Sequence, residues 1–261
     1  MTVQVKDLLL FEMKVVNRSF IFLAIFFAAC GAVEPTPTPY PAPELVSEEG
    51  MITYYQMTMA DGTPLEYGVV LPDNYVAGET YPVLLAFPPG PQTKAMVEAG
   101  MGYWGAEGQA RGWLVVSPIA PDGTLFFQGS EQYLPEFVER IEAIYPPEGG
   151  KLHVAGVSNG GISSFRIAIM MPEKFASITA VPGFPQSSDF DQLDKLTHIP
   201  ITLYVGENDT SWVERMADTE AELQRLGGQV SLTIVPNEGH VIQSLTGAEL
   251  YDLLDSHRAS E

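Results

Sequence analysis

Short apolar runs alternate with segments of helical periodicity from about residue 50 to the end of the chain. Continuous runs of apolar residues are typical of strands that are buried on both faces of a parallel sheet. The pattern predicts strands at 52–59, 65–71, 82–87, 113–117, 152–156, 176–180, 199–205 and 230–235. Apolar stripes and stop signals predict helices at 93–110, 133–144, 160–171 and 212–226, and a closing helix that includes 248–254.

This order of elements predicts an α/β protein with a mostly parallel sheet and helices on both faces. The first two strands are joined by the turn Asp61-Gly62, which predicts an antiparallel hairpin at one edge of the sheet. The 261 residues are enough for one sizeable hydrophobic core, and we expect a single catalytic domain over 49–261. Residues 181–197 leave little room for a large lid, so we expect an open site.

The N-terminal segment carries the features of an export signal. Lys14 and Arg18 precede an apolar stretch at 20–29, which is too short for a comfortable membrane span. Met13 is an alternative to Met1 as the start. The stretch ends in Phe27-Ala-Ala-Cys30-Gly31, which resembles the bacterial lipobox and implies a signal peptide over 1–29 and a lipidated Cys30. Plain secretion and an uncleaved anchor are the alternatives.

Residues 30–48 are predicted to be a tether. Alternating prolines over 34–43 exclude a helix or an interior strand and favour an extended spacer. A lipid anchor before this spacer would hold the domain on the outside of a bacterial membrane. We therefore expect membrane contact only through the N-terminal lipid.

Net charge and composition indicate which binding partners and cofactors the protein is expected to lack. The net charge is −20, and an acidic chain repels phosphate backbones, so we expect no nucleic-acid partner. Cys30 is the only cysteine, so no intramolecular disulfide can form. The four histidines are widely separated and have no metal-ligand spacing, so we expect neither a metal nor another cofactor.

Gly156-Val-Ser158-Asn-Gly160 matches the pattern G-x-S-x-G, between a predicted strand and a predicted helix. A serine hydroxyl needs exposure and a neighbouring base to act as a nucleophile. A sharp strand-to-helix turn supplies the exposure and requires small flanking residues. Ser158 is therefore the candidate nucleophile, and a plain glycine-rich turn is the alternative.

An acid and a histidine follow two later strands. Asp209 comes just after the strand at 199–205, and His240 comes just after the strand at 230–235. Carboxyl ends of parallel strands share one edge of a sheet, so both side chains should converge on Ser158. His240 is the candidate base and Asp209 the acid that orients it, with Glu207 as the rival acid. His153, His198 and His257 are expected to be structural.

Two backbone amides should receive the charge that develops on a substrate oxygen. One candidate is the amide of Asn159, directly after the serine. The other lies in the proline-rich loop after 82–87, where prolines have no amide hydrogen. Gly90 is the first choice there and Gln92 the second.

The motifs Gly156-Val-Ser158-Asn-Gly-Gly161, Gly206-Glu-Asn-Asp209 and Gly239-His240 resemble the α/β-hydrolase superfamily. The subgroup that the chain resembles contains dienelactone hydrolases, polyhydroxybutyrate depolymerase-like and feruloyl-esterase-like proteins and small carboxylesterases. The resemblance covers about residues 50–257 and implies a Ser-His-Asp triad. One departure is Pro88-Pro89, where many members have His-Gly.

These features predict hydrolysis of a small-molecule or polymeric carboxylic ester through an acyl-serine. Alternatives are a peptidase of the prolyl-oligopeptidase type, an acyltransferase, or a tethered binding protein without catalytic activity. Four aromatic residues are candidates for lining the substrate pocket, and the alternative for each is a place in the core: Phe126, Phe127, Phe184 and Trp212.

Overall fold

The computed structural model describes residues 40–258, which form one nine-stranded sheet. The strand order is β1-β2-β3-β5-β4-β6-β7-β8-β9. The strands from β5 to β9 in this order are parallel, and β1, β2, β3 and β5 pair antiparallel. Their bounds are β1 Glu44–Glu49, β2 Ile52–Thr58, β3 Pro64–Val70, β4 Val83–Phe87, β5 Leu114–Pro118, β6 Leu152–Gly156, β7 Phe175–Ala180, β8 Ile201–Gly206 and β9 Val230–Val235.

Strand β1 corrects the predicted boundary between tether and domain. It begins at Glu44, inside the segment 30–48 that was predicted to be tether, and it pairs with β2 from Glu44 opposite Gln56 to Glu49 opposite Ile52. The strand lies at the sheet edge and is almost wholly exposed. Its sequence therefore has no apolar alternation, and only the pairing with β2 defines it as a strand.

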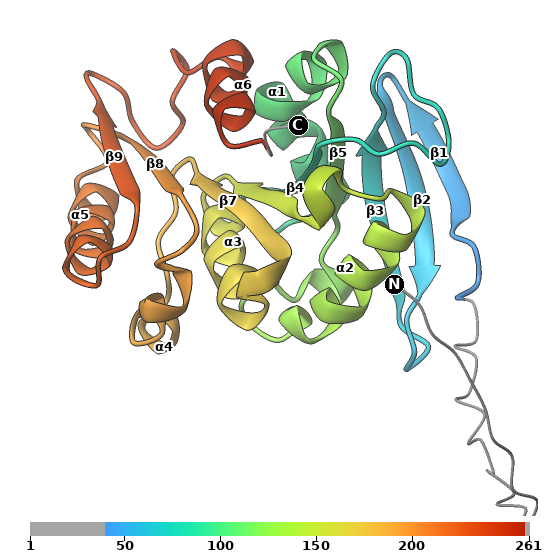
Figure 1. Ribbon diagram of the computed structural model, residues 1–261, viewed down its shortest axis with the longest axis horizontal. Helices are drawn as coiled ribbons and strands as arrows, with labels where there is room; N and C mark the ends of the chain where they lie inside the picture. Colours follow the sequence, from blue (N-terminus) through green and yellow to red (C-terminus); the bar gives the residue numbers. More distant parts are fainter. Residues whose placement is uncertain (1–39, 259–261) are drawn as a thin grey trace, which may run out of the picture. The chain divides into compact units, whose positions relative to one another are not determined.

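Helices cover both faces of the sheet (Figure 1). On one face α1 and α6 bury Trp104 and Tyr251 against the strands, and on the other α2, α3 and α5 bury Phe137, Phe165 and Leu223. Both faces of the central strands are thus buried away from solvent, which explains their continuous apolar sequences. The helix bounds are α1 Lys94–Ala110, α2 Leu134–Ile144, α3 Asn159–Met170, α4 Ser187–Phe190, α5 Thr210–Arg225 and α6 Gly247–Ser256.

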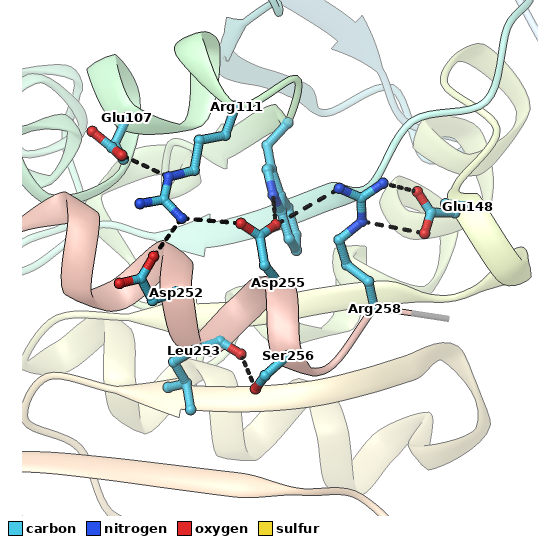
Figure 2. A network of polar contacts seen from close by, with 9 residues as sticks. Glu107, Arg111, Glu148, Asp252, Leu253, Asp255, Ser256 and Arg258 are labelled. Atoms are coloured by element: carbon cyan, nitrogen blue, oxygen red, sulfur yellow. Dashed lines mark hydrogen bonds and ion pairs between the residues drawn. The ribbon is translucent and has the colours of Figure 1, made fainter. Parts of the chain in front are cut away.

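The last helix is held by charged side chains at its end (Figure 2). Asp255 of α6 accepts hydrogen bonds from the indole of Trp113 at 2.9 Å and from the guanidinium of Arg111 at 3.1 Å. Arg258 forms an ion pair with Glu148 at 2.6 Å. These contacts fix α6 against α1, so that the segment before α6, which contains His240, has both ends anchored.

The predicted signal peptide, the lipidation site Cys30 and most of the predicted tether lie outside the described residues. Within residues 40–258, no helix has the length and apolar character needed to cross a membrane.

Candidate active site

Ser158 lies in the sharp turn between β6 and α3. Its backbone has φ 57° and ψ −117°, a conformation that costs energy for a residue with a side chain. The turn is tight because α3 starts close to β4. A β-carbon on Gly160 would lie 2.1 Å from the carbonyl oxygen of Phe87, so this position requires glycine. The strained turn presents a half-buried Ser158 at the carboxyl end of the sheet.

The structure brings Asp209 and His240 together with Ser158. Asp209 follows β8 and precedes α5, and His240 lies in the segment after β9. Nδ1 of His240 is 2.6 Å from Oδ2 of Asp209, and Nε2 is 2.8 Å from Oγ of Ser158. The three residues come from loops after parallel strands, whose carboxyl ends share one edge of the sheet.

The direction of these hydrogen bonds follows from the chemistry of the groups. An ionised carboxylate only accepts hydrogen bonds, so Nδ1 of His240 carries the proton that Asp209 accepts. Nε2 of the neutral ring is then an acceptor for the hydroxyl of Ser158. The side chain of Asp209 is 14% exposed and that of His240 41%. This arrangement can take a proton from Ser158 and keep the imidazolium next to a shielded carboxylate.

Glu207, the rival acid, has a different task. Its carboxylate accepts a hydrogen bond from the backbone amide of Asn237 at 3.0 Å. Glu238 accepts two more, from the amides of Gln243 and Ser244. The side chain of Ser244, and then these two amides, lower the pKa of Glu238. Both carboxylates therefore hold the backbone on the two sides of His240.

The backbone amides of Gly90 and Asn159 donate to no acceptor among the described residues. Gly90 has φ 54°, and its carbonyl oxygen accepts a hydrogen bond from the side chain of Asn159 at 2.8 Å. This bond, which the sequence pattern did not predict, ties the two candidate donors together. The amide of Gln92, the second choice, instead donates to the carbonyl of Pro89 at 3.0 Å.

Gln92 is fully buried and pins the loop that carries Gly90. Its side chain donates to Ser163 of α3 at 2.8 Å and accepts from the amide of Phe126 at 2.9 Å. The loop after β4 is therefore fastened to α3, the helix that begins beside Ser158. This fastening keeps Gly90 near the serine.

The four aromatic candidates fall into two pairs. Phe126 is 0% exposed and packs edge-on against Phe87 at 5.5 Å, and Phe127 is also buried. Phe126 is thus a core residue, and its predicted place in the pocket is wrong. Phe184 and Trp212 are half-buried and line a hollow of about 470 Å³.

Trp212 connects this hollow to the histidine. Its ring lies edge-on to His240 at 4.8 Å and against Phe184 at 4.7 Å. Arg215, three residues further along α5, also lines the hollow. Arg215 was not among the predicted site residues, although residues three apart on a helix share a face and the spacing from Trp212 could have indicated it.

The remaining histidines lie away from the serine. His153 is buried in β6, next to Ser177 and edge-on to Trp113, and burial lowers its pKa to about 4. His198 is exposed, and half-buried His257 follows α6. Residues 40–258 contain no group of three or more histidine, cysteine or acidic side chains that could hold a metal ion.

Comparisons with solved structures place the chain in a known fold. It is similar to a thermostable esterase, with a TM-score of 0.61, 18% identity, and coverage of 72% of this chain and 55% of that one. An S-formylglutathione hydrolase from Agrobacterium tumefaciens is similar with a TM-score of 0.66 and 16% identity, and the match covers 82% of this chain and 98% of that one. A protein described as a dipeptidyl aminopeptidase IV from Bacteroides ovatus is similar with a TM-score of 0.63 and 15% identity, and the match covers 79% of this chain and 35% of that one.

The protein has the α/β-hydrolase fold, as the sheet order and these neighbours show. The chain spans just over half of the thermostable esterase and about a third of the dipeptidyl aminopeptidase. No family model matches the sequence, and a search among curated proteins finds no match.

Proposed function

We propose that the protein is a serine hydrolase that cleaves carboxylic esters. The observation that carries the proposal is the hydrogen-bonded series Ser158–His240–Asp209, in which the serine has a strained backbone and faces the end of the sheet. A turn of this strain persists only where surrounding structure supports it, and such turns cluster at functional sites.

In the first step, His240 takes the proton of Ser158 while Oγ attacks the ester carbonyl carbon. The carbonyl oxygen gains negative charge, which the free amides of Gly90 and Asn159 stabilise. His240 then gives its proton to the leaving alcohol, and the acyl group stays on Ser158. In the second step His240 deprotonates a water molecule as the water oxygen attacks the acyl carbon. The bond between this carbon and Oγ then breaks, and His240 returns the proton to Oγ, which releases the acid and restores the serine.

The fold alone does not choose between ester and amide substrates, because esterases and a protein described as a peptidase share it. The preference for esters rests on the reactivity of the leaving group, not on the shape of the hollow beside His240. An ester needs less activation of its leaving group than an amide does. Parallel assays with p-nitrophenyl butyrate and butyryl-p-nitroanilide distinguish the two classes.

The experiment that tests this function is labelling with a fluorophosphonate probe together with turnover of p-nitrophenyl butyrate. The wild-type protein should be labelled at Ser158 and should hydrolyse the ester. The variant Ser158→Ala should do neither while its circular dichroism spectrum stays the same. Full esterase activity of this variant, or a folded wild-type protein that resists the probe, would contradict the proposal and favour a binding protein.

We also propose that Cys30 is lipidated after cleavage of residues 1–29 and that the proline-rich segment after it holds the domain outside a bacterial membrane. Support comes from the motif Phe27-Ala-Ala-Cys30-Gly31 after an apolar stretch. Labelling with an alkyne-tagged palmitate in a bacterial host should modify the wild-type chain and leave Cys30→Ser unmodified. A mature chain that begins beyond Cys30 would contradict this proposal.

A further inference from the structure

The hollow beside His240 is lined by both apolar and polar side chains. Trp212 and Phe184 are its aromatic residues, and Trp212 also contacts the ring of His240 at 4.8 Å. Arg215 belongs to the same lining, together with the hydroxyl groups of Ser187 and Ser211. Ser211 and Trp212 lie four and three residues before Arg215 on α5, so each of them neighbours Arg215 on the helix surface. A group bound near His240 can therefore extend along α5 toward the guanidinium.

Arg215 differs from the other arginines that the structure describes. Each of those forms an ion pair with a carboxylate: Arg111, Arg140, Arg166, Arg225 and Arg258. Within residues 40–258, the guanidinium of Arg215 has neither an ion pair nor a hydrogen bond, in a chain whose net charge is −20. An arginine that finds no partner among so many acidic residues is free for a ligand.

The position of the guanidinium suits a carboxylate. It lies 4.9 Å from the centre of the Phe184 ring. Stacking on an aromatic face orients a guanidinium and leaves its N–H edge free, and that edge matches the two oxygens of a carboxylate.

The neighbouring acidic residues determine which charge the hollow accepts. Asp191 and Asp218 line a second hollow, which shares Phe184 and Arg215 with the first. The hollow that contains Trp212 has no acidic residue in its lining. A substrate that extends from Ser158 past Trp212 into this hollow therefore has the positive charge of Arg215, and no carboxylate, in the lining around it.

We propose that Arg215 is a specificity-determining residue that binds a carboxylate at the far end of the ester substrate. The portion of the substrate between the scissile bond and this carboxylate packs on Trp212 and Phe184. The substrate class is thus an ester with an anionic terminus, such as a half-ester of a dicarboxylic acid. This inference rests on the proposed ester hydrolysis.

The test compares matched esters. The first pair is p-nitrophenyl hemiglutarate and p-nitrophenyl valerate, which have acyl chains of equal length and differ in terminal charge. The second pair carries the charge on the alcohol side, as 4-acetoxybenzoate and 4-methylphenyl acetate. Butyrylcholine supplies a cationic ester. The ratio of kcat/KM for the anionic to the neutral member is measured at fixed ionic strength, because screening changes the contribution of exposed charges.

For at least one of the two pairs, the wild-type protein should have a higher kcat/KM for the anionic ester than for the neutral one. Arg215→Gln should lower that ratio about three- to fivefold, the upper range for an exposed ion pair. Arg215→Lys should keep part of the preference, since it retains the charge without the forked geometry. Arg225→Gln is the matched control on the same helix, because Arg225 pairs with Glu222 and does not line the hollow, and it should leave the ratio unchanged.

The inference would be overturned if the anionic-to-neutral ratio of kcat/KM were the same in Arg215→Gln and wild type. It would also be overturned if the wild-type protein had a higher kcat/KM for butyrylcholine than for the anionic esters. A binding measurement separates this failure from failure of the proposed function. Glutaryl-p-nitroanilide is titrated calorimetrically into Ser158→Ala and into Ser158→Ala with Arg215→Gln. If the wild type hydrolyses no ester but binding still depends on Arg215, the proposed reaction fails and the anion site stands. Equal binding by the two variants excludes the site.

Discussion

The backbones at Gly206 and Gly239 touch, and a β-carbon on Gly206 would lie 2.1 Å from the carbonyl oxygen of Gly239. Beside this contact, the amide of Asn208 donates to the carbonyl of Glu238 at 2.8 Å. The loop that carries Asp209 and the segment that carries His240 are therefore in direct backbone contact. This contact positions the histidine relative to its acid.

Gly206→Ala should separate these two loops. The added methyl group meets backbone atoms, which cannot move aside as a flexible side chain can. We expect kcat/KM for p-nitrophenyl butyrate to fall about 100-fold, as for a misplacement of about 1 Å. Gly239→Ala is the matched control, because its β-carbon would point into open space. Equal activity of the two variants would show that the contact does not position the histidine.

Asp209→Asn and Glu207→Gln should differ sharply in activity. Asp209 accepts from Nδ1 of His240, so an amide there favours the wrong tautomer, and kcat should fall about 10⁴-fold. Glu207 accepts from the amide of Asn237, and glutamine can still accept this bond, so kcat should change less than about tenfold. Steady-state kinetics of both variants check this. The opposite order would make Glu207 the catalytic acid.

Asn159→Ala should impair the chemical step while substrate binding is largely kept. It retains the backbone amide but removes the side-chain bond to the carbonyl of Gly90, so the two candidate oxyanion donors are no longer tied together. We expect kcat to fall about 10- to 100-fold with little change in KM, less than for loss of a whole donor. The rate of fluorophosphonate labelling should fall in parallel. A change in KM alone would argue against this positioning role.

Protonation of His153 should destabilise the folded protein in acid. Burial, and then the positive charges of His257 and Arg258, lower its pKa from 6.5 to about 4, while Asp255 acts in the opposite direction. Below pH 6.5 the unfolded chain therefore binds a proton that the folded protein does not. The contribution of His153 is complete above pH 6.5, and it is lost as the pH falls toward about 4.

Urea unfolding from pH 7 to pH 4 measures this loss, which should approach about 3 kcal/mol for His153. His153→Gln should be less stable at pH 7 and should show a flatter dependence of the free energy of unfolding on pH. His198→Gln, at an exposed position, is the control and should follow the wild type. Parallel curves for wild type and His153→Gln would exclude this role.

Most elements and the meeting of Ser158, Asp209 and His240 followed from the sequence for one physical reason. Parallel strands that are covered on both faces must be apolar throughout, so their positions are visible in the pattern of residues. Their carboxyl ends share one edge, so residues just after three such strands must lie near one another. Strand β1 was missed because an exposed edge strand is under no such constraint.

Other features depended on contacts between distant segments. Glu207 and Asp209 belong to the same loop, and only the path of the chain after β8 decides which one faces His240. Phe126 and Phe184 are the same residue type, and only packing against Phe87 or beside Trp212 separates a core ring from one that lines a hollow. Local sequence determined the strands, helices and strained turn, because these depend on burial pattern and backbone sterics. Tertiary structure decided which carboxylate contacts the histidine and that the guanidinium of Arg215 has no ion-pair partner within residues 40–258, because these depend on what each side chain reaches across the fold.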